Sequence, residues 1–264
     1  MILKPIFRWT IGRPSRVGFH IFEESVIQTI NALGRDNFDW FVCYNNLTEA
    51  QLDRLREVAK IHLLTLYEQK ICDCPLSQEN LGTLWKLCPA RIRIESYEII
   101  MDNDVVICKH LPEIDDFLGG KRCLCLDEPT RYFGRYSCYL PKTKKYNSGL
   151  IGLVPGHDFQ KDICRVWRKY GELENLNSAD EQGLLALVFL HKDQITISKD
   201  KILELHPNEI HLDSKVCCSY KNFNMNNFDG YHFVESNRNQ FHRGWNYYNL
   251  IKSNRISRYN KPLF

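Results

Sequence analysis

The sequence predicts an α/β fold in which helices flank a mostly parallel central sheet. From the N-terminus, apolar runs typical of buried strands alternate with amphipathic segments typical of helices. The chain has 264 residues, of which 44% are hydrophobic and 25% charged, and this composition is that of a globular protein with a sizeable core. The sequence contains no internal repeat and no linker-like stretch. We therefore expect one domain that spans residues 1–264.

The alternation of strand-like and helix-like segments is clearest in the first part of the chain. An apolar run over residues 2–11 predicts a strand, and apolar residues at helical spacing over 19–33 predict the helix after it. Thr48 and Gln51 have the spacing of a helix capping box, which favours a helix start over a glycosylation sequon at Asn46. The other elements expected here are a strand over 40–44, a helix over 48–61 and a strand over 62–66.

The alternation continues to about residue 198. Ser178 and Glu181 form a second capping-box pattern, so we expect a helix that starts at Ser178. After residue 198 the sequence is rich in Asn, His and aromatic residues, and we expect irregular structure over 206–244. The expected elements are strands over 97–101, 122–126 and 195–198, a loop that enters a strand over 147–154, and helices over 112–118, 157–170 and 178–191.

The charge balance argues against nucleic acid as a partner. Lys and Arg number 35 and Asp and Glu 32, and the net charge of +3 is far from the basic excess of nucleic-acid-binding proteins. The longest uncharged apolar run, residues 183–190, is less than half of the roughly 20 residues that a transmembrane helix needs. Lys4, Pro5 and Arg8 interrupt the first apolar run, so we expect no secretory signal. The sequence thus predicts a cytoplasmic protein with reduced, mostly buried cysteines.

The C-terminal end is basic. Residues 252–264 contain Lys252, Arg255, Arg258 and Lys261 and no acidic residue, so the positive charge of the chain is concentrated there. A basic segment with interleaved aromatic residues can contact an anionic membrane surface, and a solvated tail is the alternative.

Acidic residues follow the predicted strand over 97–101. Asp102 and Asp104 are two residues apart, so in extended backbone their side chains point to the same side. Two convergent carboxylates bind a hard cation such as Mg²⁺ or Mn²⁺, which in turn binds phosphate oxygens. A simple turn is the alternative, because Asp and Asn are favoured turn residues. Their position at the carboxyl end of a strand, where α/β folds bind ligands, favours a site.

Several segments in a fixed order resemble a known family. FRWTIG ends the first strand, EIIMDND contains the acidic pair, KYNSGLIGL and SADEQGLLAL follow it, and GYHFVESNR comes late, with Trp245 after it. Together they resemble the metal-dependent glycosyltransferases of the GT-A fold, in particular the glycogenin-like or family 8 type. The residues after the late His, Glu235 to Arg238, depart from the glycine and lysine that are usual in the family.

The resemblance implies a single GT-A-like, Rossmann-related domain, with a nucleotide-binding half over 1–110 and a sugar and acceptor half over 111–264. It implies a nucleotide-sugar donor, a glycan, protein or lipid-linked acceptor, and a bound Mn²⁺ or Mg²⁺. A uridine diphosphate donor is expected from the resemblance and from Trp9, which suits a small base. The residues expected to act are Asp102, Asp104 and His232 for the metal, Arg8, Trp9, Thr10, Asn103, Asn147, Ser148, Gly149, Gln182 and Arg238 for the donor, and Asp180 and Glu181 for catalysis.

Other interpretations remain open at this point. An inverting enzyme needs a carboxylate base, for which Asp180 or Glu181 is the candidate, and a retaining enzyme needs none there. Lys142, Lys144 and Lys145 could contact phosphates or belong to a solvated surface. The residues 102–106 also fit the signature of haloacid-dehalogenase-like phosphatases, with Asp102 as the nucleophile, although that motif normally opens a chain. A non-catalytic binding protein of the same fold is a further alternative.

Overall fold

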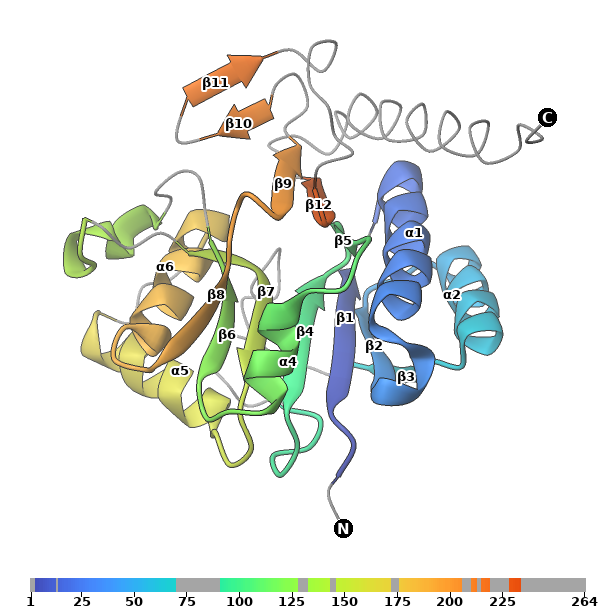
Figure 1. The fold of residues 1–264 in the computed structure, drawn as a ribbon, viewed down its shortest axis with the longest axis horizontal. Coiled ribbons are helices and arrows are strands. Elements are labelled where there is room, and N and C mark those ends of the chain that lie inside the picture. The colour runs from blue at the N-terminus through green and yellow to red at the C-terminus, as the bar shows by residue number, and fades with distance from the viewer. Residues whose placement is uncertain are drawn as a thin grey trace, which may run out of the picture.

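The structure is a computed structural model, and the residues that it describes form one main sheet with helices on both faces and a second sheet above one edge (Figure 1). The described residues are 3–12, 14–69, 91–127, 133–142, 146–171, 176–205 and 228–233, together with the backbone of 210–212 and 215–218.

Seven of the described strands form the main sheet, in the spatial order β3-β2-β1-β4-β7-β6-β8. All neighbouring pairs are parallel except those made by β7, which runs antiparallel to both β4 and β6. The predicted α/β fold with a mostly parallel sheet is therefore confirmed. The strands are β1 (Ile6–Gly12), β2 (Asp39–Asn45), β3 (Thr65–Glu68), β4 (Glu98–Asp102), β6 (Cys123–Leu126), β7 (Asn147–Leu153) and β8 (Gln194–Ile197).

Helices cover both faces of this sheet because alternate strand residues are apolar on each side. One face packs on α1 (Arg16–Leu33), α2 (Glu49–His62) and α4 (Pro112–Leu118), which lie together in one buried apolar cluster with the sheet. The other face packs on α5 (Phe159–Lys169), α6 (Ser178–Phe189) and the 3-10 helix η3 (Gly134–Tyr139) in a second apolar cluster. A short 3-10 helix, η1 (Arg35–Asn37), follows α1.

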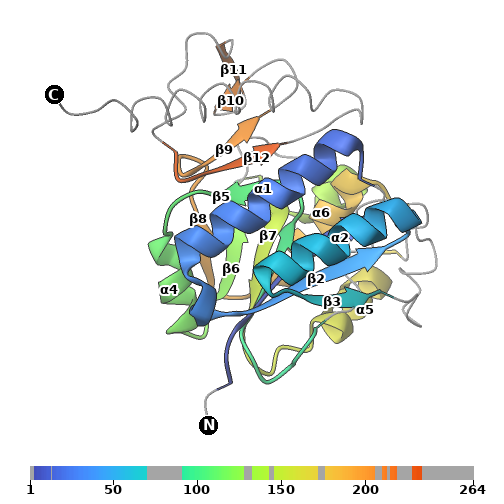
Figure 2. The same cartoon turned by 90° about the vertical axis from the view of Figure 1, so that its right-hand side faces the viewer.

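A second sheet lies above the edge where β1 and β4 end. Its strand order is β11-β10-β9-β12-β5, with β5 (Val105–Ile107), β9 (Ile202–Leu205), β10 (Ile210–Leu212), β11 (Lys215–Cys218) and β12 (Gly230–Phe233). Figure 2 shows β5, β9 and β12 above α1, on the side away from the N-terminus. Irregular structure was expected over 206–244, and the strands there correct this expectation.

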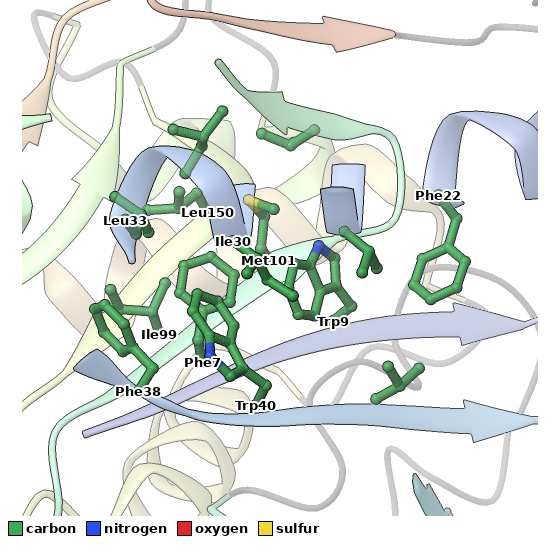
Figure 3. Packing of buried hydrophobic residues seen from close by; sticks show 14 of the residues in the cluster. Phe7, Trp9, Phe22, Ile30, Leu33, Phe38, Trp40, Ile99, Met101 and Leu150 are labelled. Carbon is green, nitrogen blue, oxygen red and sulfur yellow. The ribbon is translucent and has the colours of Figure 1, made fainter. Parts of the chain in front are cut away.

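Trp9 lies in the larger apolar cluster, between the sheet and α1 (Figure 3). Its ring is fully buried, stacks on Trp40 with ring centroids 5.6 Å apart, and contacts Phe7. The indole Nε1 donates a hydrogen bond to Ser25 Oγ at 2.9 Å, which satisfies the one polar atom of the ring. Trp9 is therefore a core residue, and its ring cannot stack on a nucleotide base as the sequence suggested.

Most expected elements are present with shifted ends. The helix over 112–118 and the Thr48–Gln51 capping box are confirmed. The strand expected over 62–66 begins only at Thr65, because α2 continues to His62 and Leu63 then adopts a left-handed conformation. Among the helices that the structure describes, none is both long and apolar enough to cross a bilayer.

Candidate functional site

The acidic motif forms the turn by which the chain leaves the main sheet and enters the second one. Asp102 is the last residue of β4 and lies opposite Thr10 of β1, while β5 begins directly after Asp104. Asp102, Asn103 and Asp104 are all partly exposed. Because β1 and β4 are parallel and β7 is antiparallel to β4, the carboxyl ends of β1 and β4 and the start of β7 share this edge.

Backbone pairing brings the late His beside the acidic turn. In β12, His232 pairs with Val105 of β5, and Phe233 N–H donates to the Asp104 carbonyl oxygen at 2.9 Å. The side chains then meet, with His232 Nε2 3.6 Å from Asp104 Oδ1. The sequence predicted both residues for one site, and the fold brings their side chains together although they are 128 positions apart in the chain.

Glu204 is a member of this site that the sequence analysis missed. It lies on β9, which is parallel to β12, and it pairs with His232 in register. Its Oε1 lies 3.8 Å from His232 Nδ1 and accepts a hydrogen bond from Asn147 Nδ2 at 2.9 Å. Glu204 is the one charged residue of a fully buried strand, Ile202–Leu205. A buried acid between apolar neighbours needs partners, and that pattern was the available signal.

Asn147 and Gly149 form the opposite wall of the site at the start of β7. Asn147 Oδ1 accepts from Gly149 N–H at 2.7 Å, so the amide of Asn147 is held from both ends. A Cβ atom on Gly149 would lie 2.8 Å from Asn147 Oδ1 and 3.1 Å from His232 Cε1. A side chain at this position would therefore displace the amide of Asn147 and crowd the imidazole ring beside β7.

The first turn of α6 adds two side chains from the other face of the sheet. Ser148 N–H donates to Gln182 Oε1 at 3.3 Å, and Ser148 Oγ donates to Glu181 Oε2 at 3.5 Å. Glu181 and Gln182 are both buried. The adjacent residues Asn147 and Ser148 of β7 point to opposite faces of the sheet and so join these contacts to those of His232 and Glu204. We call the two sets together the polar cluster, which consists of Asp104, Asn147, Ser148, Glu181, Gln182, Glu204 and His232.

Asp180 has a different environment from Glu181. Its carboxylate accepts hydrogen bonds from Arg135 N, Nε and Nη2 at 2.7, 3.0 and 2.8 Å. It also accepts from Asn177 N–H at 3.2 Å and so completes a capping box whose N-cap is Asn177, one residue before the expected Ser178. Burial acts to raise the pKa of Asp180, but the hydrogen bonds from Arg135 outweigh it and hold the pKa below its usual value.

Gly134 allows this arrangement around Asp180. It has a φ of +50°, and a Cβ atom there would lie 2.3 Å from Asp180 Oδ1. A side chain at position 134 would therefore be strained and would displace the carboxylate. The bonds of Asp180 to Arg135 and Asn177 give it a structural role at the helix start, and of the two catalytic candidates it is Glu181 that contacts the polar cluster.

Arg8 lies inside the protein, below the edge that carries the polar cluster. Its side chain is fully buried, and its Nε lies 2.9 Å from Glu98 Oε1. Glu98 is also paired with Arg91 at 3.2 Å. These contacts correct the expectation that Arg8 meets the base or ribose of a donor, because nothing outside the core can reach it. Thr10, two residues further along β1, is buried next to Asp102.

Part of the expected site lies outside the described residues. This part consists of Arg238, Lys144, Lys145 and the basic tail over 252–264. Lys142 is described and exposed.

The protein atoms at the acidic turn suit a divalent cation that is coordinated partly by the protein and partly by a substrate. Two atoms that each lie about 2.1 Å from one ion are about 3 to 4 Å apart, and Asp104 Oδ1 and His232 Nε2 meet this condition at 3.6 Å. Within the described part of the chain, no three His, Cys, Asp or Glu side chains converge closely enough to hold a metal alone. Mg²⁺ in proteins is commonly held by one or two protein ligands plus phosphates and water, so the pair fits.

Solved glycosyltransferase structures share this architecture. LgtC, a galactosyltransferase crystallised with donor and acceptor sugar analogs, is 11% identical with a TM-score of 0.58, and the match covers 94% of this chain and 95% of LgtC. The bifunctional enzyme WbbM is 12% identical with a TM-score of 0.58, over 90% of this chain and 48% of WbbM. GlyE of Streptococcus pneumoniae TIGR4 is 10% identical with a TM-score of 0.53, over 98% of this chain and 64% of GlyE. The chain thus spans about half of WbbM and nearly all of LgtC. Neither a protein-family model nor a curated protein matches it.

The chain has the GT-A fold. This finding confirms the fold that the resemblance implied. In this chain Asp102 ends β4 and 101 residues precede it, whereas the phosphatase signature normally opens a chain, so the phosphatase alternative is not favoured.

Proposed function

We propose that this chain is a glycosyltransferase that moves a sugar from a nucleoside diphosphate sugar to an acceptor hydroxyl. The observation that carries the proposal is the polar cluster, which gathers carboxylate, imidazole and amide groups from β7, β9, β12, α6 and the acidic turn at the carboxyl edge of a GT-A sheet. Ligands bind at this edge in α/β folds generally. The fold is shared with glycosyltransferases, which supports the reaction class.

Asp104 and His232 would hold Mn²⁺ or Mg²⁺, with Asp102 beside them at the end of β4. Such an ion neutralises the negative charge that develops on a leaving diphosphate. We propose that Asp102, next to Thr10 at the carboxyl ends of β4 and β1, contacts this ion on the side of the nucleotide. Asn147 and Gln182, at the start of β7 and on α6, have amide groups that can hydrogen-bond sugar hydroxyls.

Glu181 is the carboxylate that we propose for the reaction centre. It approaches Ser148 from the N-terminal turn of α6, whereas the neighbouring Asp180 remains bound to Arg135. In an inverting enzyme Glu181 would accept the proton of the acceptor hydroxyl, and in a retaining one it would stabilise the positive charge that develops on the sugar. The resemblance favours a uridine diphosphate donor. Trp9 no longer supports that preference, because the ring is buried in the core.

The test is a screen of nucleotide sugars for thermal stabilisation and for donor hydrolysis, with and without Mn²⁺. A ligand that binds only the folded state must raise its melting temperature. We expect stabilisation by a uridine diphosphate sugar with Mn²⁺, and loss of at least tenfold in donor hydrolysis for Asp104→Asn, which removes a carboxylate beside the metal.

Asp115→Asn is the matched control. This aspartate lies on α4, is exposed and pairs with His110, so its removal should leave donor binding and hydrolysis unchanged. Tighter binding of guanosine than of uridine diphosphate would overturn the donor assignment. If no nucleotide sugar stabilises the protein with or without Mn²⁺, the proposed reaction is wrong.

A further inference from the structure

Glu204 lies at the centre of the polar cluster, and the proposed reaction assigns no role to it. The residue is 5% exposed, and burial of a carboxylate costs free energy unless hydrogen bonds or charges compensate. Its two neighbours in the cluster belong to different sides of the proposed site. Asn147 lies on the sugar side and His232 on the metal side, and Oε1 of Glu204 faces both.

The imidazole of His232 is enclosed from three directions. Asp104 lies at Nε2 at 3.6 Å, Glu204 lies at Nδ1 at 3.8 Å, and β7 passes close to Cε1 at Gly149. A neutral imidazole that binds a cation through Nε2 carries its proton on Nδ1. That proton needs an acceptor, and a carboxylate in this position fixes both the tautomer and the ring orientation of a metal-binding His.

We infer that Glu204 is a positioning residue that holds His232 ready to bind the metal and ties it to Asn147. The inference rests on the proposed function, because it assigns Nε2 of His232 to the cation. In the metal-bound protein the ring moves closer than the 3.8 Å that separates Nδ1 from Oε1 here, and the carboxylate then accepts the Nδ1 proton, which leaves the Nε2 lone pair directed at the acidic turn. The same oxygen accepts from Asn147 Nδ2, so one buried atom links the residues that hold the metal to those that meet the sugar.

The experiment measures Mn²⁺ binding in the presence of uridine diphosphate, from the electron paramagnetic resonance signal of free Mn²⁺. Partners of metal-binding residues typically contribute 10- to 100-fold to metal affinity, and we expect a loss of this size for Glu204→Ala. Glu204→Gln retains an acceptor oxygen but no charge, and we expect it to lose less. Thermal unfolding of each variant shows that it is folded. If Glu204→Ala does not fold, Glu204→Gln decides, and an affinity equal to that of the unmodified protein overturns the inference.

Glu113→Gln is the matched control. Glu113 pairs with Lys201, which directly precedes β9, so this variant loses an ion pair beside the same strand without touching the polar cluster. It should bind Mn²⁺ as the unmodified protein does. An equal loss in Glu113→Gln and Glu204→Ala would mean that the effect comes from β9 as a whole, which overturns the positioning role.

A double-mutant cycle tests whether Glu204 acts through His232. In the His232→Ala background, Glu204→Ala should weaken Mn²⁺ binding by less than twofold further, since there is no ring left to orient. A full additional loss would overturn the inference. Failure of the proposed function gives a different result, because then the unmodified protein itself shows no Mn²⁺ binding with either uridine or guanosine diphosphate, and the positioning role is excluded with it.

Discussion

Asp180 and Glu181 are neighbours in the sequence, yet their carboxylates meet different partners. Asp180 accepts three hydrogen bonds from Arg135 and one from Asn177, all at the start of α6. Glu181 reaches Ser148 on β7. Successive residues of a helix point about 100° apart, so only one of the two can face the polar cluster. The direction in which each side chain leaves the helix therefore determines that Glu181, and not Asp180, contacts Ser148 on β7.

The structural role of Asp180 predicts a stability effect. Asp180→Asn removes the negative charge and replaces one of the two acceptor oxygens by an NH₂ group, so part of the charge-assisted hydrogen bonding to Arg135 is lost, and we expect a loss of about 2–3 kcal/mol in unfolding free energy at pH 7. Because the folded-state pKa is lowered, this contribution is present above the unfolded pKa of about 4 and is lost as the pH falls through the folded pKa. Urea unfolding at pH 7 and pH 3 measures both effects.

Asp53→Asn is the control for this prediction. Asp53 pairs with Arg56 on the exposed surface of α2, and such pairs contribute about 0–1 kcal/mol. A loss in Asp180→Asn that equals that of Asp53→Asn, or one that does not shrink toward low pH, would contradict the structural assignment.

At the residue scale the sequence predicted Asp104 and His232, whose side chains the fold brings together. Asp104 was recognisable because an acidic pair after a strand is a local pattern, and His232 because the late segment GYHFVESNR resembles that of the glycosyltransferases. Glu204 was not, because its partners, Asn147 and His232, become neighbours only through pairing of β9 and β12. Trp9 was misassigned because the strand sequence does not tell which face packs on α1.

At the scale of elements, hydrophobic periodicity predicted the helices and the strands of the main sheet. It failed where the chain has few apolar residues at regular spacing, as in the second sheet, whose strands are three or four residues long. Strands this short contain at most two alternations, which cannot be separated from chance. Their partners are also far away in the sequence, as β5 and β12 illustrate.

Helix ends depend on a competition between caps that the sequence does not settle. Ser178 with Glu181 and Asn177 with Asp180 both have capping-box spacing, and Arg135 draws Asp180 into the second one. We therefore expect Asn177→Ala to cost about 1 kcal/mol, because it removes the acceptor of the Asp180 N–H bond. Ser178→Ala should cost only a few tenths, since Ser178 lies inside the helix and alanine favours helices.

Denaturant unfolding of these two single variants compares adjacent, exposed positions under the same conditions. An equal cost at both positions, or a larger one at Ser178, would mean that the helix begins one residue later in solution.

At the scale of the whole molecule, the proposed site is where the two sheets meet. The main sheet contributes Asp102 and Asn147 at its edge, the second sheet contributes Glu204 and His232, and the acidic turn is one of the covalent connections between the sheets. Neither sheet alone contains the polar cluster. A ligand that contacts both sheets therefore stabilises their packing against each other, in addition to the elements that it touches.

This coupling predicts a pattern of hydrogen exchange. Amides in small, peripheral sheets exchange through local opening, which is less costly than global unfolding. Mn²⁺ with uridine diphosphate at about 100 times its dissociation constant stabilises the bound state by about 2.7 kcal/mol, so amides of β5 and β12 should exchange about 100-fold more slowly. The pairs between these strands open only when Asp104 and His232 separate, and the ligand must leave first.

Exposed residues of β3, at the far edge of the main sheet, serve as the internal reference and should change little as long as they exchange by local fraying. Equal slowing in β3 and β12 would show that the ligand acts on global stability alone, and slowing confined to β1 and β4 would place the nucleotide on the main sheet without the second one.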